Sequence, residues 1–270
     1  MQIIKLQKRG EIMKKIIKCM VVIFLLMLFV TTSEASQVVS WYCVREKNHI
    51  QPKLKDDLKV VEEYDVYWVD KRYDENSEEK VIYLTFDAGY ENGNIEKILD
   101  TLKDENVKAG FFVLENLLIK NKDLVQRMIN EGHTIANHTS KHRDMSKISS
   151  KNEFESELKS LEDIFKNEYG FEMPKFYRPP EGKFSLDNLK WAKELGYKTV
   201  MWSFAYADWD NGRQMSAEKA KVKILDNIHN GEVMLLHPTS STNAEILKDV
   251  IQSLKTQGFK FGTLEELCNK

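Results

Sequence analysis

The chain has few cysteines and few prolines. Only three of its 270 residues are cysteine and five are proline, which excludes a disulfide-stapled scaffold and a proline-rich or collagen-like chain. The cysteines also lack the C-x-x-C spacing that is typical of zinc and redox sites. Cys19 lies in a leader segment, so Cys43 and Cys268 remain, either as one disulfide or as two free thiols.

The chain also lacks a long hydrophobic run. Its longest uninterrupted apolar stretch, residues 20–30, has 11 residues, fewer than the about 20 that span a bilayer. Lysines precede this stretch at residues 14–18, and Ser33 and Ala35 follow it as small residues of a cleavage site. The pattern predicts a secretory signal peptide over residues 1–35. An uncleaved N-terminal membrane anchor is the alternative.

An excess of positive charge is missing as well. Without residues 1–35 the chain has 34 basic and 40 acidic residues, a net charge of −6. An acidic exported protein is a poor candidate for binding nucleic acid. No glycine-rich G-x-G-x-x-G fingerprint follows the first strand, which disfavours a dinucleotide-binding fold.

Apolar runs and amphipathic stretches alternate from Val81 onward. The first predicted strand ends at Phe86, and the others cover residues 109–114, 134–137, 176–178, 198–204, 233–236 and 259–261. Helices are predicted between them, for example over residues 94–105 and 150–170. This alternation predicts an α/β fold with parallel strands and outer helices, and about seven such units in residues 80–270 suit a distorted, incomplete (β/α)7-type barrel. Residues 36–79 are rich in aromatic residues and are predicted to be an extension that packs on this core.

Ionisable residues follow five of the predicted strands. They are Asp87, His138, Arg178, Asp208 and His237. Reactive groups of parallel α/β folds gather where the strands end, so these side chains predict an active site. His237 suits the role of a proton donor, because imidazole titrates near neutral pH; a buried structural histidine is the alternative. His49 and His229 have no such neighbours and are predicted to be surface residues.

Two further patterns suggest ligand binding. His138 and His142 are four residues apart, a spacing that allows two imidazoles to share a divalent metal, although no third protein ligand is obvious. Trp202 and Trp209 lie in an aromatic segment beside Asp208. Exposed aromatic faces beside an acidic site often hold sugars, whereas core packing explains Trp202 equally well.

The chain resembles the polysaccharide deacetylase family, also called the NodB-homology or carbohydrate esterase family 4 domain. Five family motifs occur in order: residues 85–87 (TFD), 138–142 (HTSKH), 178–182 (RPPEG), 208–209 (DW) and 235–237 (LLH). The resemblance spans most of the chain after residue 80, and it implies a NodB-like deacetylase domain over residues 80–270.

The resemblance also implies roles for the strand-end residues. Asp87 is expected to be the general base that activates water, and Arg178 to orient it. Asp208 is expected to tune His237, the general acid toward the leaving amine. His138 and His142 are expected to hold a divalent metal, with zinc as the expected ion. The predicted substrate contacts are Tyr90, Pro179, Trp202 and Trp209.

Position 88 departs from the family pattern. Most members have a second aspartate there, which completes an Asp-His-His metal triad, whereas this chain has Ala88. The base, both histidines and the acid are retained, so the expected activity stands while occupancy of the metal site becomes uncertain. Glu91 and Asn92 are nearby candidates for a replacement ligand.

Residues 85–93 and 205–209, together with the aromatic extension, most resemble the spore-type peptidoglycan N-acetylmuramic acid deacetylases. The resemblance implies an exported monomer that deacetylates N-acetylmuramic acid of peptidoglycan strands in the cell wall or spore cortex, on the route to muramic δ-lactam. One alternative is a deacetylase of other N-acetylated glycans, such as N-acetylglucosamine polymers or chitin. Another is a non-catalytic cell-wall binding module with a decayed metal site.

Overall fold

The structure, a computed structural model, describes residues 13–18, 20 and 38–269. The chain divides into two units, residues 1–36 and 37–270, and the second unit contains both β-sheets. Most of the predicted signal peptide lies outside the described residues. Within the described residues, no helix combines the length and apolar character needed to cross a membrane.

Eight parallel strands form the central sheet, and two short antiparallel strands, β1 and β7, pair beside it. The strands are β1 (Val38–Ser40), β2 (Val66–Tyr67), β3 (Lys80–Ala88), β4 (Gly110–Val113), β5 (Thr134–Asn137), β6 (Phe176–Tyr177), β7 (Lys183–Ser185), β8 (Lys198–Val200), β9 (Glu232–Leu236) and β10 (Phe259–Gly262). β3 is central: β9 pairs along one of its edges, and β10 and then β4 pair along the other. β3 therefore has three neighbouring strands, and the sheet around it curls into a distorted, incomplete barrel.

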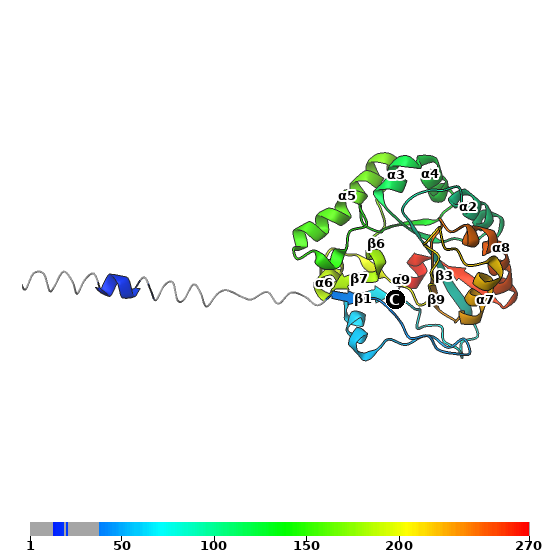
Figure 1. Ribbon diagram of the computed structural model, residues 1–270, viewed down its shortest axis with the longest axis horizontal. Helices are drawn as coiled ribbons and strands as arrows, with labels where there is room; N and C mark the ends of the chain where they lie inside the picture. Colours follow the sequence, from blue (N-terminus) through cyan, green and yellow to red (C-terminus); the bar gives the residue numbers. More distant parts are fainter. Residues whose placement is uncertain (1–12, 19, 21–37, 270) are drawn as a thin grey trace, which may run out of the picture. The chain divides into compact units, whose positions relative to one another are not determined.

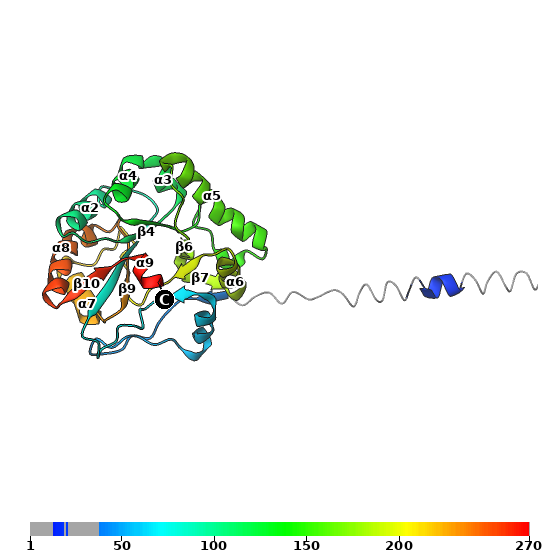
Figure 2. The ribbon, with the colours of Figure 1, turned by 180° about the vertical axis from the view of Figure 1, so that it is seen from behind.

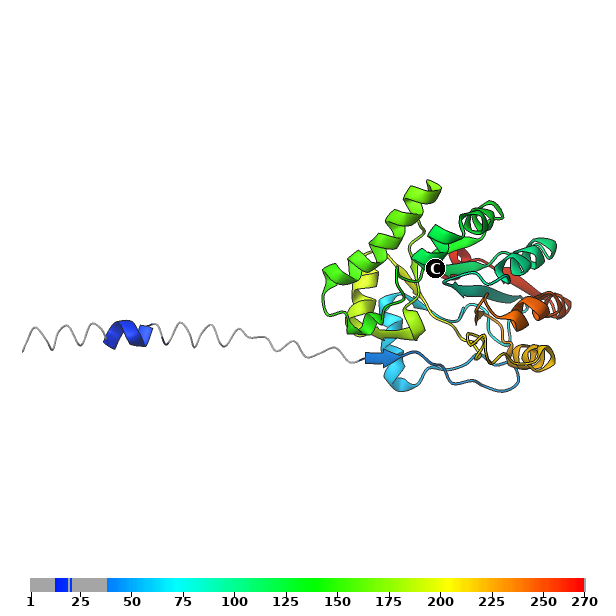
Figure 3. The ribbon, with the colours of Figure 1, turned by 45° about the horizontal axis from the view of Figure 1, so that its top comes forward.

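Helices pack around the outside of this sheet, except for the short α9, which lies within its curve (Figure 1, Figure 2). They are α2 (Ile95–Asp104), α3 (Glu115–Lys120), α4 (Lys122–Asn130), α5 (Lys151–Tyr169), α6 (Leu186–Glu194), α7 (Ala217–Asn227), α8 (Ser241–Thr256) and α9 (Leu264–Cys268), with 3-10 turns η1 (Asp56–Tyr64), η2 (Met145–Lys147) and η3 (Pro180–Gly182). The tilted view shows α5, in green, and α8, in orange, on different sides of the strands (Figure 3). The predicted α/β fold with parallel strands and outer helices is confirmed.

The alternation of side chains along β3 separates two apolar layers. Ile82, Leu84 and Phe86 are buried against the outer helices, whereas Tyr83 faces the barrel interior together with Leu264 of α9. Successive residues of a strand point to opposite faces, so Asp87 shares the inner face with Tyr83. The strand thus delivers Asp87 to the mouth of a barrel whose interior is filled by α9.

The segment that precedes β3 packs against the barrel. Trp41, Leu58 and Trp68 are buried in one cluster with Phe184 and Met201. This segment also supplies β2, a strand that the sequence pattern did not predict. β2 pairs in parallel with β8. The predicted strand over residues 198–204 is too long, because β8 ends at Val200 and the chain continues with only an isolated bridge at Phe204. Cys43 and Cys268 are both free thiols.

Candidate active site

Asp87 lies at the carboxyl end of β3 and is paired with a fully buried arginine. Arg178 Nη1 donates to Asp87 Oδ1 at 2.8 Å, and Nη2 donates to Thr85 Oγ1 at 3.0 Å. The guanidinium also donates to the carbonyl oxygens of Val200 and Met201. These four bonds fix the planar donor group in one orientation, so the carboxylate that it binds is fixed as well.

The charges around Asp87 keep it ionised. Burial alone would raise the pKa of Asp87, but the charges of His138, Arg178 and His237 outweigh burial and hold that pKa below its usual range. Burial lowers the pKa of His138 to about 4, so His138 is neutral near pH 7. At neutral pH the positive charge of Arg178, rather than that of His138, therefore stabilises the Asp87 carboxylate, and a protonated His237 adds to it.

His138 and His142 lie on a strained loop that follows β5. Thr139 and His142 both adopt left-handed backbone angles, with φ of 71° and 54°, which are unfavourable for residues other than glycine. The Asn137 side chain accepts from Thr139 N, and Thr139 Oγ1 accepts from His142 N. These bonds hold the loop so that the two imidazole centroids are 5.1 Å apart.

The tautomer of His138 follows from its partners. Nδ1 lies 2.8 Å from the carbonyl oxygen of Arg178, and a carbonyl only accepts, so Nδ1 carries the proton. Nε2, which lies 3.5 Å from Asp87 Oδ2, is then unprotonated. The neutral His138 thus has Nε2 available as a metal ligand close to the carboxylate that is expected to act as the base.

The side chains present do not make up a complete metal site. Residues 13–18, 20 and 38–269 contain no group of three His, Cys, Asp or Glu side chains placed to hold a metal ion. Ala88 is buried in the outer apolar layer. The Glu91 carboxylate accepts from Gly93 N and Ile95 N at the start of α2, and the Asn92 amide donates to Thr239 O. The two suggested replacement ligands are therefore engaged elsewhere.

His237 and Asp208 form a second pair at the end of β9. The His237 Nδ1 lies 2.7 Å from Asp208 Oδ1, and His237 N donates to Asp208 Oδ2 at 2.8 Å. Because a carboxylate only accepts, Nδ1 carries the proton and Nε2 remains for the substrate. Burial lowers the pKa of His237, but the bond to Asp208 and the charges of Asp208 and Asp87 outweigh it, so the pKa is raised. A protonated imidazole is thus favoured beside an ionised carboxylate.

The predicted substrate residues divide into two groups. Trp209 is 60% exposed and stands edge-on to His237, with ring centroids 6.1 Å apart. Tyr90 is also exposed and its hydroxyl accepts from Asn211 Nδ2. Trp209 therefore borders the acid, and both aromatic rings are accessible to a ligand.

The other two predicted substrate residues are less exposed than Trp209 and Tyr90. Pro179 is buried. Trp202 is half-buried and packs beside Gly182, where an added Cβ would lie 2.7 Å from Cη2 of the indole. Its carbonyl oxygen accepts from Trp41 Nε1 at 2.9 Å. These contacts favour the core-packing interpretation of Trp202.

Of the two histidines predicted to be surface residues, one is buried and one is exposed in the structure. His229 is buried, with Nε2 at 2.9 Å from Ser203 Oγ and Nδ1 at 3.1 Å from Glu232 Oε2, so the prediction of a surface residue is wrong. His49 is exposed as predicted. Glu232 follows His229 by only three residues, whereas Ser203 comes from a distant segment that the local sequence does not indicate.

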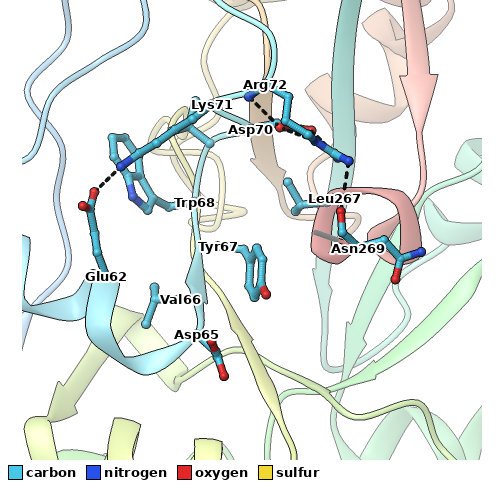
Figure 4. A pocket seen from close by; sticks show the side chains of 11 residues that line it. Glu62, Asp65, Val66, Tyr67, Trp68, Asp70, Lys71, Arg72, Leu267 and Asn269 are labelled. Carbon is cyan, nitrogen blue, oxygen red and sulfur yellow. Dashed lines mark hydrogen bonds and ion pairs between the residues drawn. The ribbon is translucent and has the colours of Figure 1, made fainter.

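A separate pocket lies beside β2 and the C-terminal segment (Figure 4). It is lined by residues 65–72 with Glu62, Leu267 and Asn269. Arg72 binds the Asp70 carboxylate and the carbonyl oxygen of Asn269. Tyr83 also donates to Asp70, and Tyr83 lies about 13 Å along β3 from Asp87. None of the predicted site residues lines this pocket.

Comparisons with known proteins identify the family of this chain. The family model described as polysaccharide deacetylase matches residues 74–200. The chain is 37% identical over 233 residues to the peptidoglycan-N-acetylmuramic acid deacetylase PdaA of Bacillus subtilis, and the match covers 86% of both proteins. The chain belongs to the polysaccharide deacetylase family. This membership confirms the predicted enzyme class, a carbohydrate deacetylase.

Solved structures of family members extend the comparison. The structure of Bacillus subtilis PdaA superposes with a TM-score of 0.80 at 37% identity, over 86% of this chain and 97% of that one, which supports the barrel fold. A peptidoglycan-N-acetylglucosamine deacetylase of Bacillus cereus is 37% identical over 69% of this chain and 67% of that protein. A family pseudoenzyme from Bacillus anthracis has a TM-score of 0.63 at 26% identity, over 71% of this chain and 66% of that one.

Proposed function

We propose that this chain is an exported peptidoglycan deacetylase that hydrolyses the N-acetyl group of N-acetylmuramic acid. The observation that carries the proposal is a pair of buried contacts: Arg178 lies 2.8 Å from the Asp87 carboxylate and lowers its pKa, and Asp208 lies 2.7 Å from His237 and raises the pKa of that imidazole. The similarity to PdaA supports the muramic acid substrate, because it extends over more of the chain than the similarity to the N-acetylglucosamine deacetylase. The freed amine would then close on the lactyl carboxyl to give muramic δ-lactam in spore cortex.

Hydrolysis of the amide requires a base and an acid. Asp87 takes a proton from water as the water oxygen attacks the acetyl carbonyl carbon. His237 donates its Nε2 proton to the amine nitrogen as the carbon–nitrogen bond breaks, which leaves acetate and the free amine. Arg178 holds Asp87 in place and Asp208 holds His237, and each pair sets the protonation state that its step requires.

The metal is a separate proposal. Deacetylases of this family are metal-dependent, and the two imidazoles of His138 and His142 are ligands that suit zinc. We propose that they bind a divalent metal weakly, because no third protein ligand is in place among the described residues. Metal analysis after dialysis should find less than one zinc per chain, and activity should rise with added zinc. Stoichiometric zinc that survives dialysis would contradict weak binding.

The substrate is tested by mass spectrometry of glycan strands incubated with the purified protein, with and without their peptide stems. Loss of acetyl from N-acetylmuramic acid is expected, and Asp87→Asn should abolish it. Loss of acetyl only from N-acetylglucosamine would assign the chain to the other glycan specificity.

We expect the protein to act as a monomer outside the cytoplasmic membrane, which sedimentation and cell fractionation would check.

A non-catalytic wall-binding module is the second candidate. Ala88 and the similarity to a family pseudoenzyme favour it. Binding of the purified protein to cell-wall glycan without any loss of acetyl, with or without added zinc, would establish this alternative. In that case Asp87→Asn would leave binding unchanged.

A further inference from the structure

Two helices of this protein begin with the same local sequence. Ser185 precedes α6 and Ser240 precedes α8, and each has an asparagine three residues later, Asn188 and Asn243. Both serine hydroxyls accept from the backbone N–H of that asparagine. Both asparagines are buried. A serine followed by a polar residue at this spacing predicts a reciprocal capping box.

Only one of these two helices, α6, completes that capping box. The Asn188 Oδ1 accepts from Ser185 N at 2.9 Å. At α8 the equivalent backbone N–H of Ser240 donates instead to the carbonyl oxygen of His237. The Asn243 side chain therefore does not bind the backbone N–H of its cap residue, although it occupies the same helix position as Asn188.

The Asn243 amide contacts the acid pair of the active site. Asn243 Nδ2 donates to Asp208 Oδ2 at 2.6 Å and to the His237 carbonyl oxygen at 3.1 Å. Asn243 Oδ1 accepts from the hydroxyl of Tyr206. Both acceptors of Nδ2 lack a proton to give, so the orientation of the amide is fixed by its partners.

The geometry assigns Asn243 as a positioning residue that holds Asp208 against His237. Asp208 Oδ2 receives Asn243 Nδ2 and His237 N, which leaves Oδ1 aligned with His237 Nδ1. Without the amide, Oδ2 has one donor fewer and the carboxylate is freer to rotate away from the imidazole. The inference rests on the proposed function only in taking His237 as the acid; its effect on the imidazole is independent of any substrate.

The test compares Asn243→Leu with the matched control Asn188→Leu. Both replace a buried asparagine at the third position of a helix by an apolar side chain of similar size. At a pH above the pKa of His237, nitrogen NMR of the wild type should show the neutral ring protonated at Nδ1. Asn243→Leu should raise the population protonated at Nε2 and lower kcat about tenfold or more, within the about 10²–10⁴-fold that a general acid contributes, with KM changed less than about twofold. Asn188→Leu should lower the melting temperature without either effect.

The inference is overturned if Asn243→Leu folds and leaves the His237 tautomer unchanged, because Asn243 is then only structural. A wild-type ring protonated at Nε2 would overturn it as well. If Asn243→Leu does not fold, the smaller Asn243→Ala replaces it, because it also removes the donor to Asp208 Oδ2. It should raise the population of His237 protonated at Nε2, and an unchanged tautomer would refute the inference. All the NMR readings need no substrate, so they remain decisive if the protein has no deacetylase activity.

Discussion

Replacing Arg178 with methionine tests whether the site depends on a buried ion pair. The guanidinium is fully buried and makes its bonds to Asp87, Thr85 and two carbonyl oxygens. Methionine has a similar length but no donor, so Asp87 would remain as a buried charge without its partner. Breaking such a pair from one side costs about 3–5 kcal/mol, a large part of the about 5–15 kcal/mol that stabilises a typical protein. We therefore expect the free energy of unfolding to fall by about 3–5 kcal/mol, and activity to be lost.

A double-mutant cycle measures the coupling in this pair. Asp87→Asn, Arg178→Met and the double variant are unfolded in urea and followed by circular dichroism. The double variant leaves neither charge unpaired, so its loss of stability should be smaller than the sum of the two single losses by about 1 kcal/mol or more. Lys260→Met breaks the exposed ion pair with Glu79 and should cost about 0–1 kcal/mol. Additive losses in the cycle would refute the argument that Arg178 acts through Asp87.

Three further variants test the acid pair and the packing beside Trp202. Asp208→Asn removes the carboxylate that raises the pKa of His237 against burial, so that pKa should fall and the alkaline loss of kcat should move to lower pH in a pH–rate profile; an unmoved profile would contradict this role. His237→Gln should lower kcat by about 10²–10⁴-fold with little change in KM, measured by steady-state kinetics of acetate release. Gly182→Ala places a Cβ 2.7 Å from the ring of Trp202 at a φ of +64° and should cost about 1–3 kcal/mol by thermal unfolding. Gly170→Ala, at a φ of +76° with no atom within 4 Å, isolates the backbone contribution, and equal losses for the two glycines would exclude the clash.

The sequence predicted the barrel because its strands and helices carry strong patterns. β5 occupies residues 134–137 as expected, and α5 occupies most of the predicted range 150–170, with Ser150 as its N-cap and the left-handed Gly170 as its C-cap. β2 was missed because it has only two residues, Val66 and Tyr67, in a charged segment. Its pairing with β8 is determined by tertiary contacts, and periodicity cannot detect a strand this short.

The candidate site was predictable wherever a residue ends a strand. Asp87, His138 and His237 follow apolar runs, and their convergence follows from the parallel topology. Asn243 was not predictable, because the sequence S-x-x-N indicates a helix cap and the structure uses its amide elsewhere. Thr85 carries no signal of its own beyond its place in a motif, since its bond to Arg178 joins residues 93 positions apart.

The charges of the site argue for catalysis rather than for binding alone. Burying Asp87 with Arg178, and Asp208 with His237, costs desolvation free energy that apolar residues of similar size would avoid. A surface that only binds glycan needs neither pair, whereas amide hydrolysis needs an ionised base and a protonated acid together. Ala88 faces the apolar layer between β3 and the helices, so the lack of a carboxylate there leaves both pairs intact. The similarity to a pseudoenzyme is therefore outweighed by the two buried pairs, and a measurement of acetyl release should find activity despite Ala88.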